Sequence, residues 1–554
     1  MKLSRMLKAV KVNSIYHTGE GAAIKDGFEQ SSNHDPDINP DINSVHYRAQ
    51  DVQPGGLFVA IPGLLADGHD FIDQACMRGA LAIVSQKPVQ PDNSVTQNTR
   101  QIKAKQVKAR QSKKGLTIVE VDNSRKALAG ISAAFFGNPS QKLNIIGITG
   151  TNGKTTITYL IESMLSNAGL KSGVIGTINY RYMGRVFENP VTTPESLELQ
   201  KILAKMLKEG VTHVVMEVSS HAIDLLRIEN CWIDMGVFTN LTQDHLDYHG
   251  DMDSYWLCKK RMFTEYLPSG PKKERALAVI NCDNPKGREL FNILPVRGIS
   301  TGHSADNLIW PEIHKHDLNG IAGNISTPAG SFDFKSPLVG KHNIENILSA
   351  TGVGIALDLS LDDIKAGIEN VFFIPGRLER ITGNNGLFIY VDYAHTPDAL
   401  GNVLTSLKAV SHKKIICVFG CGGDRDRKKR PLMGAIAGRL CDLAIVTSDN
   451  PRTEDPEKII DQILSGLNKT CKHEYSLSSL KTGFDKKGYV IEPDRKNAIK
   501  LGIAVSRQGD TVLIAGKGHE TYQILGKKTI AFDDRKEAKQ ALLNEAQSTK
   551  NKTA

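Results

Sequence analysis

The stretch IIGITGTNGKTTITYLIESML, residues 145–165, constrains the fold more than any other part of the chain. An apolar run enters a glycine-rich turn, and Lys154, Thr155 and Thr156 then open a segment with apolar residues at helical spacing. A strand, a glycine-rich turn and a helix in this order form a phosphate-binding loop, because amides at the helix N-terminus face the phosphates. The usual spacing has glycine where this chain has Ile148. A glycine turn without a ligand is the alternative, and the Lys-Thr pair argues against it.

The length of 554 residues predicts roughly three or four domains at ~150 residues each. Hydrophobic residues make up 40% and charged residues 23%, which is typical of a soluble globular protein. No apolar run approaches the ~20 residues that cross a bilayer, and the N-terminus has no signal-peptide pattern. We therefore expect a cytoplasmic protein without membrane insertion. The eight cysteines are scattered without C-x-x-C spacing, which disfavours a zinc site or a disulfide framework.

The formal net charge of +9 raises the question of nucleic-acid binding. Much of the excess lies in NTRQIKAKQVKARQSKKG, residues 98–115, which contains no acidic residue. Its flank is polar and contains proline, so the region of about 90–115 is interpreted as a solvated insertion. A nucleic-acid arm is the alternative, but no aromatic side chains interleave with the charges. We expect no nucleic-acid partner.

Apolar runs alternate with helical patterns along most of the chain, which predicts an α/β protein with parallel sheets. The predicted domains are a small N-terminal α/β domain (1–141), a central doubly wound P-loop domain (142–373) and a C-terminal Rossmann-like domain (374–554). The helix that ends the first domain is expected to begin with Ser124 as its cap. Polar or glycine residues follow the strands of the last domain, where ligands gather in such sheets.

Candidate metal ligands follow two strands of the central segment. Glu217, in MEVSSHA, offers a carboxylate to magnesium, and Thr155 offers its hydroxyl. Asp244 and His245 lie in NLTQDHLDYHG, where a turn, a helix cap or a hydrogen-bonded loop histidine is the structural alternative. A capping carboxylate is the alternative for Glu217.

Seven motifs occur in order: GTNGKTT, TTPESLELQ, EVSSHA, NLTQDHLDYHG, GRLERI, DYAHTPDAL and GCGGDRDRKKRPLMG. Together they resemble the Mur ligase family, the ATP-dependent amide ligases of peptidoglycan synthesis, whose P-loop has the form G-T-x-G-K-[ST]. The resemblance extends from about residue 42 onward and implies three domains. It also implies ATP as co-substrate, two Mg²⁺ ions and an acyl-phosphate intermediate on the substrate UDP-N-acetylmuramoyl-L-alanyl-D-glutamate. The implied ATP contacts are Gly150, Thr151, Asn152, Gly153, Lys154, Thr155, Thr156, Asn343 and Arg377.

The family resemblance implies catalytic roles for Lys154, Glu217, His245 and Lys259, and metal binding by Thr155 and the last three. Lys259, in YWLCKKRMF, is implied to be carbamylated (N6-carboxylysine). A bare ammonium would be repelled by metal ions, whereas a carbamate supplies an anionic oxygen. Lys260 is the competing candidate, and the four-residue step from Tyr255 favours Lys259. A solvated helix lysine is the structural alternative for both.

By resemblance, the first domain binds uridine, and the sugar-peptide contacts are Tyr47, Thr192, Thr193, Ser219, Leu225 and Arg227. The chain departs from the family pattern here. Relatives have Asp-Ser-Arg where this sequence has His46-Tyr47-Arg48, so Tyr47 replaces a serine that contacts uridine. Val191 stands where some relatives have asparagine.

The stretch SDNPRTEDP, residues 448–456, bears on which amino acid is added. It resembles the motif of family members that add meso-diaminopimelate, while lysine-adding relatives lack its arginine. A guanidinium grips the second carboxylate of diaminopimelate through two hydrogen bonds and repels the terminal ammonium of lysine. A proline turn with a surface arginine is the alternative. The implied acceptor contacts are Arg425, Asp449, Asn450, Pro451, Arg452, Gly516 and Glu520.

Two other functions compete with this reading. One is another enzyme of the superfamily, such as a folylpolyglutamate synthase, and the acceptor motifs argue against it. The other is a nucleotide switch that hydrolyses ATP without ligation, for which Glu217, His245 and Lys259 would be superfluous. We expect the partners to be small molecules only and the protein to be a monomer.

Overall fold

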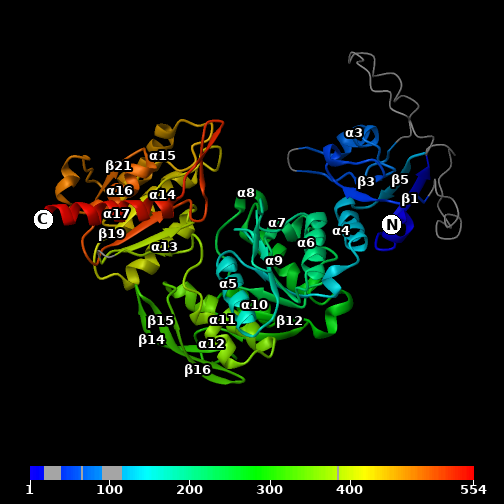
Figure 1. The fold of residues 1–554 in the computed structure, drawn as a ribbon, viewed down its shortest axis with the longest axis horizontal. Coiled ribbons are helices and arrows are strands. Elements are labelled where there is room, and N and C mark those ends of the chain that lie inside the picture. The colour runs from blue at the N-terminus through cyan, green and yellow to red at the C-terminus, as the bar shows by residue number, and fades with distance from the viewer. Residues whose placement is uncertain (18–38, 64–65, 90–114, 384–385, 554) are drawn as a thin grey trace, which may run out of the picture.

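The computed structural model describes residues 1–17, 39–63, 66–89, 115–383 and 386–553. Apart from residue 115, the basic stretch 98–115 lies outside the described residues. Figure 1 shows separate sheets spread along the long axis of the molecule, with the N- and C-terminal parts at opposite ends. Within the described residues, no helix has both the length and the apolar character to cross a bilayer.

The N-terminal part forms a five-stranded sheet with the order β1-β5-β4-β3-β2. Only β1 is antiparallel to its neighbour. The helix α4 begins after Asn123, whose side chain accepts from the backbone N–H of Lys126. The expected Ser124 cap was therefore wrong, because Ser124 lies inside the helix and its hydroxyl donates to Gln86. The elements are α1 (Leu3–Leu7), β1 (Val12–His17), β2 (Ser44–His46), β3 (Gly56–Val59), α3 (Ile72–Met77), β4 (Ala82–Ser85), β5 (Thr117–Val121) and α4 (Ser124–Phe135).

The central part is built on an eight-stranded sheet with the order β13-β12-β11-β6-β10-β7-β8-β9. Its neighbouring strands pair in parallel except β7 with β8 and β8 with β9, so only β8 runs in the opposite direction. Its strands are β6 (Asn144–Thr149), β7 (Ser172–Ile175), β8 (Tyr180–Tyr182), β9 (Arg185–Phe187), β10 (His213–Glu217), β11 (Met235–Phe238), β12 (Leu277–Asn281) and β13 (Arg297–Thr301). Its helices are α5 (Lys154–Asn167), α6 (Ser196–Lys208), α7 (Ser220–Asp224), α8 (Leu246–His249), α9 (Met252–Arg261), α10 (Pro285–Phe291), α11 (Lys341–Ala356) and α12 (Leu361–Glu369).

Helices cover both faces of this sheet, as a doubly wound fold requires. Successive side chains of a strand point to opposite faces, so Ile145 and Ile146 of β6 enter different hydrophobic cores. The core around Ile146 also contains side chains of α5, α11 and α12, and the core around Ile145 contains side chains of α6 and α9. The continuous apolar sequence of β6 follows from burial on both faces.

An antiparallel sheet of three strands, which the sequence analysis did not anticipate, follows the central strands. It consists of β14 (Trp310–Asp317), β15 (Gly320–Thr327) and β16 (Gly330–Ser336). In β16, buried and exposed side chains alternate, and Phe332 and Phe334 join the core that contains α5. This alternation is typical of a sheet with one face in a core and the other in solvent.

The C-terminal part forms a six-stranded sheet with the order β17-β18-β22-β19-β20-β21, in which only β17 is antiparallel to its neighbour. One face packs against α13–α15 and the other against α16 and α17. Its strands are β17 (Glu379–Ile381), β18 (Phe388–Asp392), β19 (Ile415–Phe419), β20 (Leu443–Val446), β21 (Gly488–Ile491), β22 (Thr511–Ala515) and the hairpin β23 (Tyr522–Leu525) and β24 (Lys528–Ala531). Its helices are α13 (Pro397–Val410), α14 (Lys429–Leu440), α15 (Pro456–Thr470), α16 (Arg495–Ala504) and α17 (Asp534–Thr553).

A fully buried ion pair joins the first residues of α16 and α17. Arg495 donates from Nε and Nη2 to the two carboxylate oxygens of Asp534, at 2.8 and 2.7 Å. We expect Asp534→Ala to lower the free energy of unfolding of this domain by about 3–5 kcal/mol, because it leaves the guanidinium buried and unpaired. Lys496→Ala, which removes a half-exposed partner of Glu537, should cost less than about 1 kcal/mol. Urea unfolding measures the free energy of unfolding of both variants. Equal losses would contradict a special contribution of the buried ion pair.

Candidate active site

The glycine-rich turn lies between β6 and α5, as predicted. Gly150 and Gly153 both have positive φ, at 142° and 90°. A Cβ on Gly150 would lie 1.9 Å from Thr239 Oγ1, and one on Gly153 would lie 2.2 Å from Asn346 Oδ1. Both positions therefore require glycine, which explains physically why the variant spacing retains these two residues.

Residues after β11 hold the rest of the turn. The backbone N–H of Thr151 donates to Asn240 O at 2.8 Å, and that of Asn152 donates to Asn240 Oδ1 at 2.9 Å. Thr239 Oγ1 donates to Asn152 O at 2.6 Å. Neither residue has a role predicted from the sequence, although Asn240 is the first residue of the motif NLTQDHLDYHG and Thr239 precedes it.

The Lys154 side chain lies along the turn that it follows. Its Nζ donates to the carbonyl oxygens of Gly150 and Thr151 at 2.9 and 2.8 Å. Burial lowers the pKa of Lys154; the carboxylates of Glu217 and Asp244 oppose this effect, and the positive charge of Arg377 adds a smaller decrease. Arg377 lies two residues before β17, and its guanidinium lies 4.8 Å from the centre of the Tyr393 ring. A cation of the C-terminal domain thus lies within electrostatic reach of the P-loop lysine.

Glu217 ends β10 beside the P-loop and is 1% exposed. It accepts from Thr155 Oγ1 at 3.0 Å, and from the N–H and hydroxyl of Thr177, each at 2.9 Å. The Thr177 hydroxyl also contacts the hydroxyl of Thr192, at 3.0 Å. Thr155 and its neighbour Thr156 are both buried in the first turn of α5. The two oxygen donors proposed for one metal ion, Thr155 and Glu217, therefore lie in direct contact.

Lys259 projects from α9 toward the same turn. It is 1% exposed, and its Nζ donates to Gly150 O at 2.9 Å and lies 4.6 Å from the centre of the Tyr255 ring. Burial, with a further contribution from the charge of Lys154, holds the pKa of Lys259 well below its usual value. Lys260, the competing candidate, is only half-buried.

His245 precedes α8 and has a left-handed backbone, with φ at 54°. Its Nε2 lies 3.5 Å from Asp244 Oδ2. Burial lowers the pKa of His245, and Lys154 and Lys259 lower it further while Asp244 opposes them. No group of three or more His, Cys, Asp or Glu side chains that could hold a metal occurs in the part of the chain that the structure describes. The predicted metal ligands are one hydroxyl, one carboxylate, one imidazole and one modified lysine. Only two of these four are His, Cys, Asp or Glu side chains, so they do not form a group of that kind.

Asn343 lies in the first turn of α11 and connects to the P-loop through a second asparagine. Its Nδ2 donates to Val339 O at 2.7 Å, and its Oδ1 accepts from Asn346 Nδ2 at 2.9 Å. Asn346 is the residue that packs against Gly153. The sequence analysis included Asn343 and overlooked Asn346, which lies three residues later on the same helix face.

A hydrogen bond connects the central and C-terminal domains next to the P-loop. Thr242 Oγ1 donates to Asp398 Oδ2 at 2.9 Å and accepts from Asn152 Nδ2 at 3.2 Å. Asp398 lies in the first turn of α13. Thr242 lies in the motif NLTQDHLDYHG and Asp398 in DYAHTPDAL, but neither residue has an individual role predicted from the sequence.

Three residues implied for the sugar-peptide substrate meet at the end of β10. Thr193 Oγ1 donates to Glu217 O at 2.8 Å and accepts from the N–H of Ser219 at 3.1 Å. Arg227 Nη1 donates to Thr193 O at 3.1 Å. Leu225 directly follows α7, and its side chain is half-buried. The predicted substrate residues thus adjoin the predicted metal residue Glu217.

Tyr47 lies where the N-terminal domain meets α6. Burial and the nearby carboxylate of Glu198 raise the pKa of Tyr47, and its side chain packs against the core that contains Leu197 of α6. A second contact across this boundary joins Arg125 Nη1 of α4 to Glu195 Oε2 at 2.9 Å, and Arg227 Nε lies 3.6 Å from the same oxygen. Tyr47 therefore takes part in the domain contact, a role that a serine at this position would be too short to fill.

Most of the residues implied for the acceptor come from the loops after β20 and β22, the two strands that flank β19. Asp449 to Arg452 follow β20, and Gly516 and Glu520 follow β22. Asn450 Nδ2 donates to Glu520 Oε2 at 3.0 Å, so the two loops are in contact. Pro451 is buried, and Gly516 has a positive φ of 121°. Lys517, between these residues, was not assigned from the sequence.

Two arginines approach the same glycine on the loop after β19. A Cβ on Gly422 would lie 2.9 Å from Arg452 Nη1 and 3.9 Å from Arg425 Cγ. Arg452 has a left-handed backbone, with φ at 53°, and its Nη1 donates to Gly423 O at 2.8 Å. Arg425 is exposed and donates to Asp424 O. The structure brings both arginines to one side of the acceptor loops.

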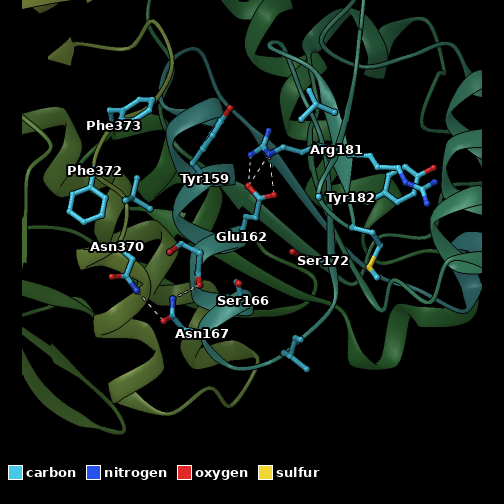
Figure 2. Close-up of a pocket in the computed structure, with 17 residues that line it drawn as sticks. Tyr159, Glu162, Ser166, Asn167, Ser172, Arg181, Tyr182, Asn370, Phe372 and Phe373 are labelled. Carbon is cyan, nitrogen blue, oxygen red and sulfur yellow. Dashed lines mark hydrogen bonds and ion pairs between the residues drawn. The ribbon is translucent and has the colours of Figure 1, made fainter. Parts of the chain in front are cut away.

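A cavity of about 730 Å³ lies elsewhere, along the flank of α5 (Figure 2). The β8–β9 hairpin and residues 370–373 complete its wall. Figure 2 shows Arg181 bound to Glu162 and the aromatic rings of Phe372 and Phe373 at its edge. Its lining contains none of the site residues that the sequence predicted. We therefore place the candidate active site at the ends of the strands, not in this cavity.

Comparisons with known proteins match all three parts of the chain. Residues 41–136 match the Mur ligase family catalytic domain, residues 148–354 the Mur ligase middle domain, and residues 376–518 the Mur ligase glutamate ligase domain. A UDP-N-acetylmuramoyl-L-alanyl-D-glutamate–2,6-diaminopimelate ligase of Geobacter metallireducens is 46% identical over 90% of this chain and 93% of its own. The enzyme of the same name from Geobacillus thermodenitrificans is 40% identical over 91% and 95%.

Solved structures agree in fold. A structure of UDP-N-acetylmuramoyl-L-alanyl-D-glutamate–2,6-diaminopimelate ligase is 29% identical, with a TM-score of 0.62 over 91% of this chain and 95% of its own. The MurF ligase of Thermotoga maritima in complex with ADP is 19% identical, with a TM-score of 0.57 over 92% and 98%, and supports the fold alone.

Proposed function

This chain belongs to the Mur ligase family, and on that premise we propose that it adds meso-2,6-diaminopimelate to UDP-N-acetylmuramoyl-L-alanyl-D-glutamate at the expense of ATP. It is a ligase that forms a carbon–nitrogen bond and produces the UDP-N-acetylmuramoyl tripeptide, ADP and phosphate in peptidoglycan synthesis. We propose that it works in the cytoplasm and as a monomer.

The reaction has two steps. The terminal carboxylate of the dipeptide attacks the γ-phosphorus of ATP, so that an acyl phosphate forms and ADP leaves. The amine of diaminopimelate then attacks the acyl carbon, the carbon–oxygen bond to phosphate breaks, and the amine loses a proton. Two anions meet in the first step, so positive charge must lie between them. Lys154 supplies a cation at the P-loop, and Arg377 supplies a second from the C-terminal domain.

The donor set beside the P-loop fits magnesium. Thr155 and Glu217 offer hard oxygen ligands in direct contact, and they would hold one ion. His245 and Lys259 would help to hold the second, with Lys259 as its carbamate. When bound, the two Mg²⁺ ions neutralise charge on the phosphates and the reacting carboxylate.

Burial prepares Lys259 for carbamylation. Its pKa is held well below the usual value, which favours the neutral, nucleophilic form of the amine. The nitrogen attacks carbon dioxide, a carbon–nitrogen bond forms, and a proton is released. The resulting anion would lie next to Lys154, whose positive charge stabilises it.

The observation that carries the choice of acceptor is the contact between the two acceptor loops. Arg452 supplies a guanidinium and Glu520 a carboxylate, and Asn450 joins their loops. The far end of diaminopimelate has both a carboxylate and an ammonium, so it matches both groups. Lysine has only the ammonium and would leave Arg452 without a partner.

The test is an ATP-dependent ligation assay with UDP-N-acetylmuramoyl-L-alanyl-D-glutamate, comparing meso-diaminopimelate with L-lysine. Product mass and phosphate release are measured together. We expect kcat/KM for diaminopimelate to exceed that for lysine by more than about 100-fold, as is typical of sites with a buried polar group matched to one substrate. A preference for lysine would overturn the acceptor assignment. ATP hydrolysis without product from either acceptor would favour a nucleotide switch.

A further inference from the structure

The acceptor loops contain a buried cation for which the proposed reaction has no direct use. The strands β22 and β20 lie on either side of β19, so the loops that follow them meet at one edge of the sheet. Lys517 lies in the loop after β22, and its side chain is 0% exposed. Because a buried ammonium is costly unless it is paired, its partners indicate what it does.

Within the described residues, the hydrogen-bond and ion-pair partners of the Lys517 ammonium are residues implied in acceptor binding. Its Nζ lies 3.0 Å from Asn450 Oδ1, 3.0 Å from Glu520 Oε2 and 3.6 Å from Asp449 Oδ1. It also lies 5.6 Å from the centre of the Tyr522 ring, on β23. One ammonium thus connects the loop after β20 with the loop after β22.

These contacts fix the orientation of both side chains that Lys517 joins. Asn450 Oδ1 accepts from Lys517 and from the N–H of Ile524 at 3.0 Å, so its Nδ2 faces Glu520 and donates to Oε2. Glu520 therefore uses Oε2 for both of its internal hydrogen bonds. Within the described residues, Oε1 makes no hydrogen bond to the protein, and the Glu520 side chain is 18% exposed. This leaves one carboxylate oxygen of Glu520 for a ligand.

Lys517 also balances the charges of the loops. Asp449 and Glu520 are two carboxylates in one half-buried site. Burial raises the pKa of Asp449, but the charges of Lys517 and Arg495 outweigh this effect and leave it below the usual value. Asp449 Oδ1 is buried without a hydrogen bond in the described part of the chain, and the ammonium of Lys517 is its nearest ion-pair partner.

We propose that Lys517 is a positioning residue for the acceptor amino acid. Its ammonium holds Asn450 and Glu520 so that Glu520 Oε1 receives the distal ammonium of the acceptor. This inference rests on the proposed function and extends it, because it assigns the selectivity for that ammonium to a residue that does not touch the acceptor.

The experiment compares Lys517→Met with wild type, using two acceptors. One is meso-diaminopimelate, and the other is 2-aminoheptanedioate, which has the distal carboxylate but lacks the distal ammonium. We expect KM for diaminopimelate to rise about 10- to 100-fold, with kcat changed less, because a buried charged partner is lost. KM for 2-aminoheptanedioate, ATP and the UDP-dipeptide should change less than about threefold, since none of them uses Glu520 Oε1.

Lys528→Met makes the same substitution on an exposed lysine of β24 and should leave every KM unchanged. Lys517→Gln, which retains a hydrogen-bond donor, should show the same selective rise in KM but a smaller one. An equal rise in KM for both acceptors, or no rise in KM for diaminopimelate, would overturn the proposal. So would loss of folding in both Lys517 variants, because Lys517 would then serve the fold. Absence of ligation by wild type would instead reject the proposed function.

Discussion

Replacement of Lys259 by alanine is expected to abolish nearly all ligation. The substitution removes both the amine that lies 2.9 Å from Gly150 O and the carbamate proposed to form on it. We expect kcat to fall more than about 100-fold, because even outer partners of metal ligands contribute about 10- to 100-fold. ATP binding, measured by calorimetry without acceptor, should remain, since the P-loop amides are intact.

Lys260→Ala provides a matched control, because it removes the neighbouring lysine of the same helix. It should retain kcat within about threefold, as surface substitutions usually do. Exhaustive removal of carbon dioxide from the buffer should lower the activity of wild type, and added bicarbonate should restore it. Full activity of Lys259→Ala, or a comparable loss in Lys260→Ala, would refute the role proposed for Lys259.

Replacement of Arg452 by alanine is expected to remove the preference for diaminopimelate. Its guanidinium approaches Gly422 and binds Gly423 O, and the neighbouring loop carries Glu520. We expect kcat/KM for diaminopimelate to fall about 100- to 1000-fold, because the distal carboxylate loses a charged, bidentate partner. kcat/KM for L-lysine should stay level or rise, since the cation that repels its ammonium is gone. Competition between the two acceptors, followed by product mass, measures the change.

Arg427→Ala is the control for this experiment. Arg427 is an exposed arginine between Arg425 and α14, and it pairs with Glu454 at 3.2 Å. Its loss should leave the ratio of kcat/KM for the two acceptors unchanged. If Arg452→Ala and Arg427→Ala lowered kcat/KM equally for both acceptors, the general positive charge of the site would explain binding. Specific recognition by Arg452 would then be wrong.

Much of the fold could be predicted because its signals are local. The apolar runs of β6, β10, β11 and β12 appear in the sequence as strands buried on both faces. The P-loop was recognisable because its glycines, Lys154 and Thr155 are consecutive. The sheet β14–β16 was not predicted, since its strands alternate buried and exposed side chains and resemble polar connecting segments.

The residues of the candidate site likewise include some that local sequence signals reveal and others that they do not. Motifs supplied Glu217, Lys259, Arg452 and Glu520 as residue types with a chemical task. Their partners come from distant parts of the chain: Asp398 is 156 residues from Thr242, and Lys517 is 67 residues from Asn450. No periodicity or spacing encodes such pairs, so sequence reasoning missed Thr242, Asp398 and Lys517.

The sequence by itself thus determined the P-loop, the alternation of strands and helices, and the types of side chain at the strand ends. It could do so because backbone preference and side-chain chemistry act over a few residues. Only the tertiary structure decided which of those side chains meet. It brought Lys259 to the P-loop, packed Tyr47 against the core that contains Leu197 of α6, and buried Lys517 between two acceptor loops. These outcomes depend on how sheets stack and how domains pack, and therefore on the whole chain.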